Sequence, residues 1–359
     1  MTRMSRVVSK HLFDFKPAGK LDEDLAAVIK GAATAPEAKQ LKERMDELAA
    51  KNDDESNAGY LTLFRGYCMN FGALIQSDPA YDGVSDKIVT TSLAVPTDHD
   101  GKFDVPVAVY TPKTIDGKSM RAAYIYAHGG GIVAMTGEHM RKPLSKFAVD
   151  NEIVVFNVDY RLAPETKCPN NIKDFYEVIK HVHANAECLG IDAGKICIAG
   201  DSGGGYICLG AMVLLAESDE SHMIKLAIPG IPMTDDYCFS DPLAMNIEER
   251  NVHMMMRKIW KYYVASDWET QKHSPHLFPG KASEELLEKF PPTIILETEF
   301  DMFITEASRL AGRLRRAGRL LELVVIPGSS HGGWLFPGMK VCNVFWDTMN
   351  TIAREYIHA

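Results

Sequence analysis

From about residue 86 to the end, the chain alternates short β-rich runs with longer amphipathic segments. Eight runs are rich in β-branched and other apolar residues, at 88–95, 105–110, 122–127, 153–158, 196–199, 226–229, 293–297 and 321–326. Helix-like segments follow the later runs, at 172–187, 204–216, 306–317 and 343–356. This alternation is typical of parallel βαβ units rather than of a sandwich. We therefore predict an α/β fold with a mostly parallel, eight-stranded sheet flanked by helices, and an antiparallel edge where the first two strands lack a helix between them.

Two regions interrupt this rhythm. Residues 1–84 carry apolar residues at helical spacing over 21–29 and 41–48, which predicts two amphipathic helices. These helices either pack on the main body or form a lid over a pocket. Residues 235–286 show no convincing strand and concentrate bulky side chains, namely Met254, Met255, Met256, Trp260, Tyr262, Tyr263 and Trp268. This insertion either has a small core of its own or forms a cap whose aromatic residues line a substrate cavity.

Composition narrows the classes of partner. The formal charge of −9 gives no electrostatic reason to bind nucleic acid. Seven cysteines are scattered without a C-x-x-C pair, so free thiols are expected, and we expect neither a metal ion nor a cofactor. The acidic run 53–55 lacks the spacing of a calcium loop and is interpreted as a solvated linker. The basic N-terminus lacks an apolar run of signal-peptide length and no stretch approaches a membrane span, so a cytoplasmic location is expected.

The pattern G-x-S-x-G occurs at Gly200-Asp201-Ser202-Gly203-Gly204, directly after one predicted strand and before a predicted helix. A serine in such a tight turn is held in a strained backbone conformation that small neighbours tolerate, so its hydroxyl projects at the carboxyl edge of the sheet. The start of the helix favours negative charge nearby. Ser202 is therefore a candidate nucleophile.

A second match, Gly328-Ser329-Ser330-His331-Gly332, also follows a predicted strand. In this kind of site the serine precedes its acid and then its histidine along the chain. Too few groups follow Ser330 to satisfy that order, so we interpret Ser330 as a loop residue.

Three further segments supply partners for Ser202. His128-Gly129-Gly130-Gly131 follows the predicted strand 122–127, and its backbone N–H groups, together with that of Gly203, are suited to stabilising a developing oxyanion. His128 itself is expected to orient this loop. His331 follows the last predicted strand, so it lies at the carboxyl edge of the sheet, where it can act as a general base. The strand 293–297 runs into three carboxylates that are candidates for orienting His331, of which Asp301 is preferred to Glu299 and Glu306.

Together with Asp159-Tyr160-Arg161-Leu162-Ala163-Pro164-Glu165, the runs at 128–131 and 200–205 resemble the motifs of the hormone-sensitive-lipase-like esterases of the α/β-hydrolase fold. The resemblance covers about residues 86–359. It implies that Gly130, Gly131 and Gly203 form the oxyanion hole and that Asp301 is the triad acid. It further implies that Tyr160, Arg161 and Glu165 support the glycine loop. The chain departs from the family at 302–306 and at Gly332-Gly333-Trp334, which bears on substrate preference rather than on the triad.

These expectations define a domain organisation and a reaction. The resemblance implies a helical cap from residues 1–84 and from an insertion at 235–286, with the catalytic core divided between 85–234 and 287–359. We predict a serine carboxylic ester hydrolase that acts on small-molecule esters with short-to-medium acyl chains through an acyl-enzyme. The pocket is expected to include Trp260, Tyr263 and Trp334. An amidase, lactonase or acyltransferase with the same triad remains open, as does a non-catalytic ligand receptor on this fold. The resemblance also implies a homodimer.

Overall fold

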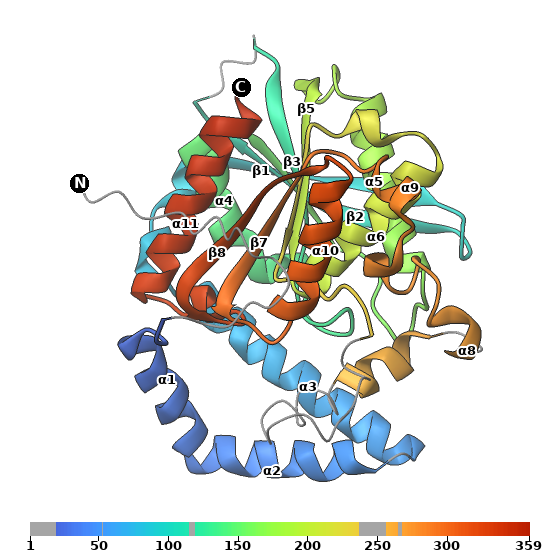
Figure 1. Ribbon diagram of the computed structural model, residues 1–359. Coiled ribbons are helices and arrows are strands. Elements are labelled where there is room, and N and C mark those ends of the chain that lie inside the picture. Colours follow the sequence, from blue (N-terminus) through green and yellow to red (C-terminus); the bar gives the residue numbers. More distant parts are fainter. Residues whose placement is uncertain (1–18, 52, 115–118, 237–255, 265–267) are drawn as a thin grey trace.

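The structure, a computed structural model, describes residues 19–51, 53–114, 119–236, 256–264 and 268–359. Its sheet consists of strands β1 to β8, at Ile88–Thr97, Phe103–Pro112, Arg121–Ala127, Val154–Val158, Ile191–Asp201, Leu226–Gly230, Thr293–Phe300 and Leu320–Ser330. The strand order is β1-β2-β4-β3-β5-β6-β7-β8 (Figure 1). β2 pairs antiparallel with β1 and with β4, whereas the other neighbours are parallel. The predicted sheet and its antiparallel edge are therefore confirmed.

Helices cover both faces of the sheet (Figure 1). α4 (Arg141–Asn151) and α11 (Lys340–Ile352) pack together on one face. α5 (Asn170–Ala184), α6 (Gly203–Glu217) and α10 (Ile304–Arg316) lie on the other. The four predicted helices are confirmed with small shifts of their ends.

α4 was not expected from the sequence. Pro143 lies in its first turn, where the missing N–H costs little because no intrahelical partner exists there. Leu144, Phe147 and Ala148 recur at helical spacing and are all buried. The apolar spacing of these residues between two strands is the sequence signal for α4.

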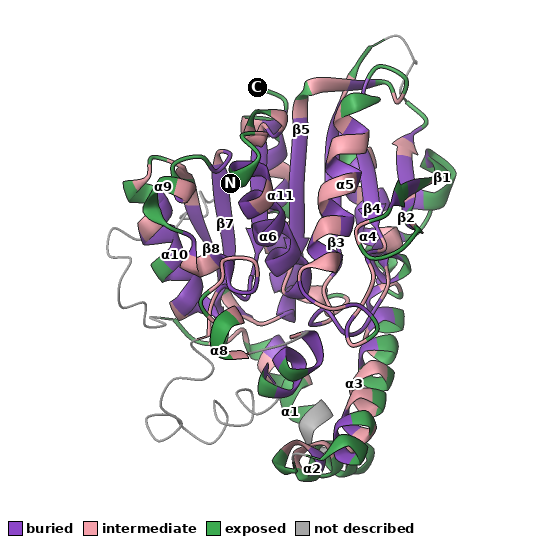
Figure 2. Cartoon of the chain, turned by 90° about the vertical axis from the view of Figure 1, so that its right-hand side faces the viewer, coloured by how far each residue is buried: buried purple, intermediate pink, exposed green. Residues whose placement is uncertain are grey.

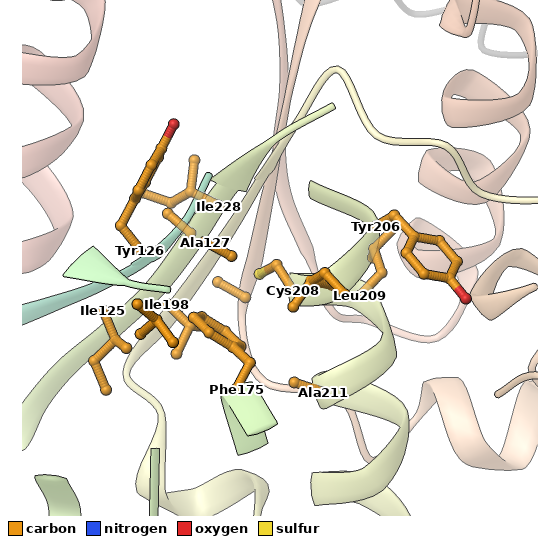
Figure 3. Close-up of a cluster of buried hydrophobic side chains, with 14 of the residues drawn as sticks. Ile125, Tyr126, Ala127, Phe175, Ile198, Tyr206, Cys208, Leu209, Ala211 and Ile228 are labelled. Carbon is orange, nitrogen blue, oxygen red and sulfur yellow. The ribbon is translucent and has the colours of Figure 1, made fainter. Parts of the chain in front are cut away.

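Buried side chains of the sheet and of α6 form part of the core. Figure 3 shows Ile125 and Ile198 of the sheet beside Phe175 of α5 and Cys208 of α6. Nearly every residue of α6 is buried, so this helix is apolar all round rather than amphipathic. Because α6 begins at Gly203, its burial fixes the turn that contains Ser202.

Three helices precede the sheet: α1 (Glu23–Thr34), α2 (Pro36–Ala50) and α3 (Asp54–Ile75). They lie beyond the carboxyl ends of the parallel strands, and Figure 2 shows α2 mostly exposed and the central strands of the sheet buried. The first two helices were predicted and are confirmed. The third, α3, is the longest of the three and was not predicted.

The acidic run at the start of α3 is a helix cap rather than a linker, which corrects that interpretation. The side chain of Asp53 accepts hydrogen bonds from Ser56 N at 2.8 Å and from Ser56 Oγ at 3.0 Å. Such a cap satisfies backbone donors that have no partner within the helix. Asp54 and Glu55 in the first turn are favoured by the helix dipole.

Part of the insertion lies outside the described residues, including Met254 and Met255. Residues 256–263 form a helix that is bonded to the N-terminal region. Its Lys258 Nζ donates to Asn57 Oδ1 at 2.6 Å and to the backbone oxygen of Lys51, and Tyr262 Oη donates to the backbone oxygen of Asn57. The two regions outside the regular alternation therefore contact each other.

Candidate active site

Ser202 occupies the turn between β5 and α6 with φ of 56° and ψ of −115°. This left-handed backbone is rare for a residue with a side chain, and its neighbours must be small. A Cβ on Gly200 would lie 2.4 Å from Gly204 O, and one on Gly204 would lie 2.0 Å from Ala127 O. The two glycines of the motif are therefore required by close backbone contacts.

His331 connects Ser202 to a carboxylate. Its Nε2 lies 2.9 Å from Ser202 Oγ, and its Nδ1 lies 2.9 Å from Asp301 Oδ2 and 3.1 Å from Oδ1. The three residues follow β5, β7 and β8, whose carboxyl ends meet at one edge of the sheet. The structure thus brings all three predicted residues into one hydrogen-bonded chain.

The carboxylate of Asp301 is held by two further donors. Thr298 Oγ1 donates to its Oδ2 at 3.0 Å, and Phe303 N donates to its Oδ1 at 2.8 Å. The ring of Phe303 packs edge-on against His331 with 5.2 Å between ring centroids. Asp301 is buried, so these contacts fix both its position and the plane of the imidazole.

The other two candidate acids are engaged elsewhere. Glu299 accepts from Gly19 N at 2.6 Å and from Gly328 N at 2.9 Å, so it joins the N-terminal segment to the end of β8. Glu306 accepts from Thr234 N at 2.7 Å. Ser330 is the last residue of β8, and its backbone is not left-handed. The second G-x-S-x-G match therefore does not form a nucleophile turn.

The glycine loop after β3 lies against this turn. Gly130 and Gly131 have φ of 103° and 62°, and Ile132 has φ of 63°. A Cβ on Gly203 would lie 2.9 Å from Gly131 N and 2.7 Å from Ile132 N. Backbone N–H groups of the loop therefore lie close to Gly203, beside Ser202. Ile132, the strained residue after the glycines, had no distinguishing signal in the sequence.

Of the residues predicted to support the glycine loop, Tyr160 contacts it directly, whereas Arg161 and Glu165 bond to residues of helices. Tyr160 Oη donates to His128 O at 2.7 Å, and the two rings stack with 4.4 Å between centroids. Arg161 instead bonds to Asp174 of α5, at 2.9 Å and 2.7 Å. Glu165 accepts hydrogen bonds from Arg65 of α3 at 2.9 Å and 2.7 Å, and Arg65 in turn donates to Val133 O of the loop.

A carboxyl group beside the nucleophile was not singled out from the sequence. Tyr126 Oη donates to Asp201 Oδ2 at 2.5 Å. Burial raises the pKa of Asp201 to about 7, against the opposing effects of the Tyr126 hydrogen bond and of His331. A Cβ on Gly230 would lie 2.6 Å from Asp201 Oδ1, so a third strand also confines this side chain.

An apolar cavity of about 310 Å³ opens at Ser202 and His331. α3 supplies one wall, and the helix 256–263 supplies part of another. The apolar and thiol side chains that line the cavity are Phe64, Tyr67, Cys68, Phe71, Met135, Met140, Ile231, Met233, Met256, Ile259, Met302, Phe303 and Leu335. Burial raises the pKa of the Cys68 thiol to about 12, so this wall stays uncharged at neutral pH.

The expected pocket aromatics lie outside this lining, which corrects that prediction. Trp334 stacks on Phe345 with 3.7 Å between centroids, behind the site. Trp260 packs against Tyr206 at 5.3 Å, and Tyr263 Oη donates to Asn171 Oδ1. Trp260 and Tyr263 are thus core residues, because they pack against the first turns of α6 and α5 rather than toward the cavity.

Two further features are absent from the described residues. No group of three or more His, Cys, Asp or Glu side chains in that part of the chain is arranged to hold a metal ion. None of the helices described there has the length and apolar character needed to cross a bilayer.

Comparisons with known proteins show what the chain is similar to. The family described as the alpha/beta hydrolase fold matches residues 124–335. An ethyl acetate hydrolase of Pseudomonas putida is 28% identical over 250 residues, which cover 70% of this chain and 75% of the relative. The carboxylesterase NlhH of Mycobacterium tuberculosis is 31% identical over 242 residues, covering 65% and 72%. A solved bacterial heroin esterase superposes with a TM-score of 0.75 at 27% identity, covering 95% of this chain and 99% of the other.

The chain therefore belongs to the α/β-hydrolase family, in the branch of the esterases related to hormone-sensitive lipase. This confirms the resemblance inferred from the three sequence motifs. The match covers the segment from β3 to just beyond His331, and it leaves α1 to α3 outside.

Proposed function

We propose that this chain is a serine carboxylic ester hydrolase in which Ser202 is the nucleophile, His331 the general base and Asp301 the residue that orients the base. The observation that carries the proposal is the continuous hydrogen-bonded chain from Ser202 Oγ through His331 to Asp301, beside the glycine loop. The esterase names of the relatives support the same class of reaction.

The geometry supports a two-step mechanism. His331 Nε2 takes the proton of Ser202 Oγ as this oxygen attacks the acyl carbon, and the backbone N–H groups of Gly130, Gly131 and Gly203 stabilise the oxyanion. His331 then gives the proton to the leaving alcohol, and the acyl group stays on Ser202. Water, activated by the same imidazole, attacks this acyl-enzyme and releases the acid.

The cavity supports neutral esters with short-to-medium acyl chains. Its lining within the described residues is largely apolar and contains no lysine or arginine, so neither of these cations is there to pair with an anionic acyl group. Each methylene that is buried contributes about 0.8 kcal/mol. A chain that outgrows a cavity of about 310 Å³ meets the packed wall of α3, where overpacking opposes further burial.

The alternatives are separated by one set of rate measurements. Purified enzyme is assayed with p-nitrophenyl butyrate, with the matched butyryl anilide, with a lactone, and with p-nitrophenyl butyrate in the presence of a primary alcohol. Hydrolysis of the phenyl ester that exceeds turnover of the anilide and lactone, with free acid as the main product, supports the proposal. Faster anilide or lactone turnover identifies an amidase or lactonase, and a new ester as main product identifies an acyltransferase. No turnover of any of these substrates would contradict the proposal.

A further inference from the structure

α3 contacts the glycine loop through one arginine. Arg65 Nε donates to Val133 O at 2.7 Å, two residues beyond Gly131. Its Nη2 donates to Ala163 O at 3.0 Å and to Glu165 Oε2 at 2.7 Å, and its Nη1 donates to Glu165 Oε1 at 2.9 Å. One guanidinium group therefore joins the loop after β3 to the segment after β4.

These two segments are also bonded to each other. Ala163 N donates to Ile132 O at 2.9 Å, and Val133 N and Ala134 N donate to Gly130 O at 3.3 Å and 3.0 Å. Arg65 thus closes a small network in which each bond restrains the backbone next to the glycines. The N–H groups of Gly131 and Ile132 belong to the same stretch of chain.

α3 and the helix 256–263 also pack directly against the glycine loop. A Cβ on Gly131 would lie 3.0 Å from Ile259 Cδ1 and 3.7 Å from Phe64 Cε1. Phe64 is adjacent to Arg65 on α3, and Ile259 belongs to the helix 256–263. Further along α3, a Cβ on Gly72 would overlap the ring of His139, so the helix follows the chain beyond the loop as well.

We propose that Arg65 is a positioning residue for the oxyanion hole, through which the N-terminal helix α3 holds the glycine loop in its working geometry. The inference rests on the proposed function, because it assumes that the loop stabilises an oxyanion. It extends the machinery of the site to a helix outside the segment that matches the family.

Arg65 makes an ion pair with Glu165 and hydrogen bonds to two backbone carbonyl oxygens, and we expect these to contribute differently. The side chains of Arg65 and Glu165 are 34% and 62% exposed, so their ion pair is screened by solvent and contributes little. The bonds to Val133 O and Ala163 O restrain the backbone beside the glycines. Complete loss of one oxyanion donor lowers kcat by about 10² to 10³, so a displaced donor should cost part of that. A lysine carries the same charge but lacks the planar fork that reaches several acceptors at once.

The test compares Arg65→Ala, Arg65→Lys and Glu165→Gln with the wild-type enzyme. Arg44→Ala is the matched control, because Arg44 makes an exposed ion pair with Glu47 on α2. The readouts are kcat and KM for p-nitrophenyl butyrate, the inhibition constant of a trifluoromethyl ketone, and the melting temperature. The ketone forms a tetrahedral adduct, so its affinity reports the oxyanion site separately from fold stability.

We expect Arg65→Ala to lower kcat by about tenfold or more while KM changes by less than about threefold, with a parallel loss of ketone affinity. Arg65→Lys should recover part of kcat, Glu165→Gln should lose much less than Arg65→Ala, and Arg44→Ala should match the wild type. Equal losses in Glu165→Gln and Arg65→Ala would overturn the proposal, as would a lower melting temperature with unchanged kcat and ketone affinity. If Arg65→Ala does not fold, Arg65→Lys decides on the same readouts. A wild-type enzyme without esterase activity would reject the proposed function instead.

Discussion

His331 Nε2 lies 2.9 Å from Ser202 Oγ although 129 residues separate them in the chain. The sheet accounts for this proximity, because β5 and β8 are parallel and both end at the carboxyl edge. Asp301, at the end of β7, reaches the other nitrogen of the same ring. Three strand ends therefore bring Ser202, Asp301 and His331 together at one edge of the sheet.

The identity of the orienting acid is open to a direct comparison. We expect Asp301→Asn to lower kcat by about two to four orders of magnitude, because His331 loses both its orientation and the charge that stabilises its protonated form. Glu299→Gln and Glu306→Gln should have much smaller effects, since their carboxylates bond to backbone N–H groups elsewhere. Steady-state kinetics on the three variants checks this. A greater loss in Glu299→Gln than in Asp301→Asn would assign the role to Glu299.

The oxyanion loop predicts a contrast between two glycines. Gly130 has φ of 103°, and a Cβ there would lie 2.1 Å from Ala134 O, so Gly130→Ala must displace the loop. We expect kcat/KM to fall by about tenfold or more. Gly66 lies inside α3 in open space, so Gly66→Ala should keep full activity and stabilise the fold by about 0.5 to 1 kcal/mol. Kinetics and urea unfolding measure both effects, and a fully active Gly130→Ala enzyme would refute the role of the loop.

The cavity predicts how chain length affects the rate. We expect kcat/KM of the wild type to be highest for acyl chains of about two to six carbons. Met256 is buried and lines the cavity, so Met256→Ala should move the maximum to longer chains. Met69 on α3 is 52% exposed and outside the lining, which makes Met69→Ala the control. A series of p-nitrophenyl esters from acetate to palmitate tests this, and a wild-type maximum at palmitate would show that the cavity continues as a tunnel.

A buried carboxyl group predicts a dependence of stability on pH. Neither oxygen of Glu297 has a hydrogen-bond partner among the residues that the structure describes, and the side chain is fully buried. Burial, with the nearby Asp301 and Glu306, raises the pKa of Glu297 well above its ordinary value. The folded state keeps this proton where the unfolded chain has lost it, above about pH 4.3. The contribution of Glu297 to the free energy of unfolding is therefore constant below that pH and decreases as pH rises above it.

Glu297→Gln removes this effect with little change of shape. We expect the melting temperature of the variant to exceed that of the wild type by a margin that grows from about pH 5 to about pH 8. Glu37→Gln, at an exposed position on α2, should follow the wild type at every pH. Thermal unfolding of the three proteins across this range decides, and a margin that stays constant with pH would show that Glu297 does not retain its proton.

The eight strands and the nucleophile turn were predictable because each is specified by neighbouring residues. An apolar run followed by Gly200-Asp201-Ser202-Gly203-Gly204 carries its own structural requirements, and the close contacts of Gly200 and Gly204 bear these out. The choice of Asp301 among three carboxylates was not specified locally. The strand end favoured Asp301 but left Glu299 and Glu306 as alternatives, the family resemblance also pointed to Asp301, and the geometry agrees with that choice.

The lining of the pocket was not predictable, because it depends on which face of each helix points toward the cavity. Trp260 and Met256 belong to the same helix, yet only Met256 reaches the cavity. α3 was not predicted, because helices were assigned only to the apolar repeats at 21–29 and 41–48 and the acidic run at the start of α3 was interpreted as a linker. Arg65 and Glu165 are 100 positions apart in the sequence, so no local sequence pattern predicts the bond between them.

The central claim is that Ser202 carries the acyl group. The most direct measurement is reaction of the enzyme with a fluorophosphonate, followed by mass spectrometry of the labelled peptide. The account predicts one adduct on Ser202, no adduct and no esterase activity in Ser202→Ala, and full labelling and activity in Ser330→Ala. Labelling that persists in Ser202→Ala, or an adduct on Ser330 in the wild type, would contradict it.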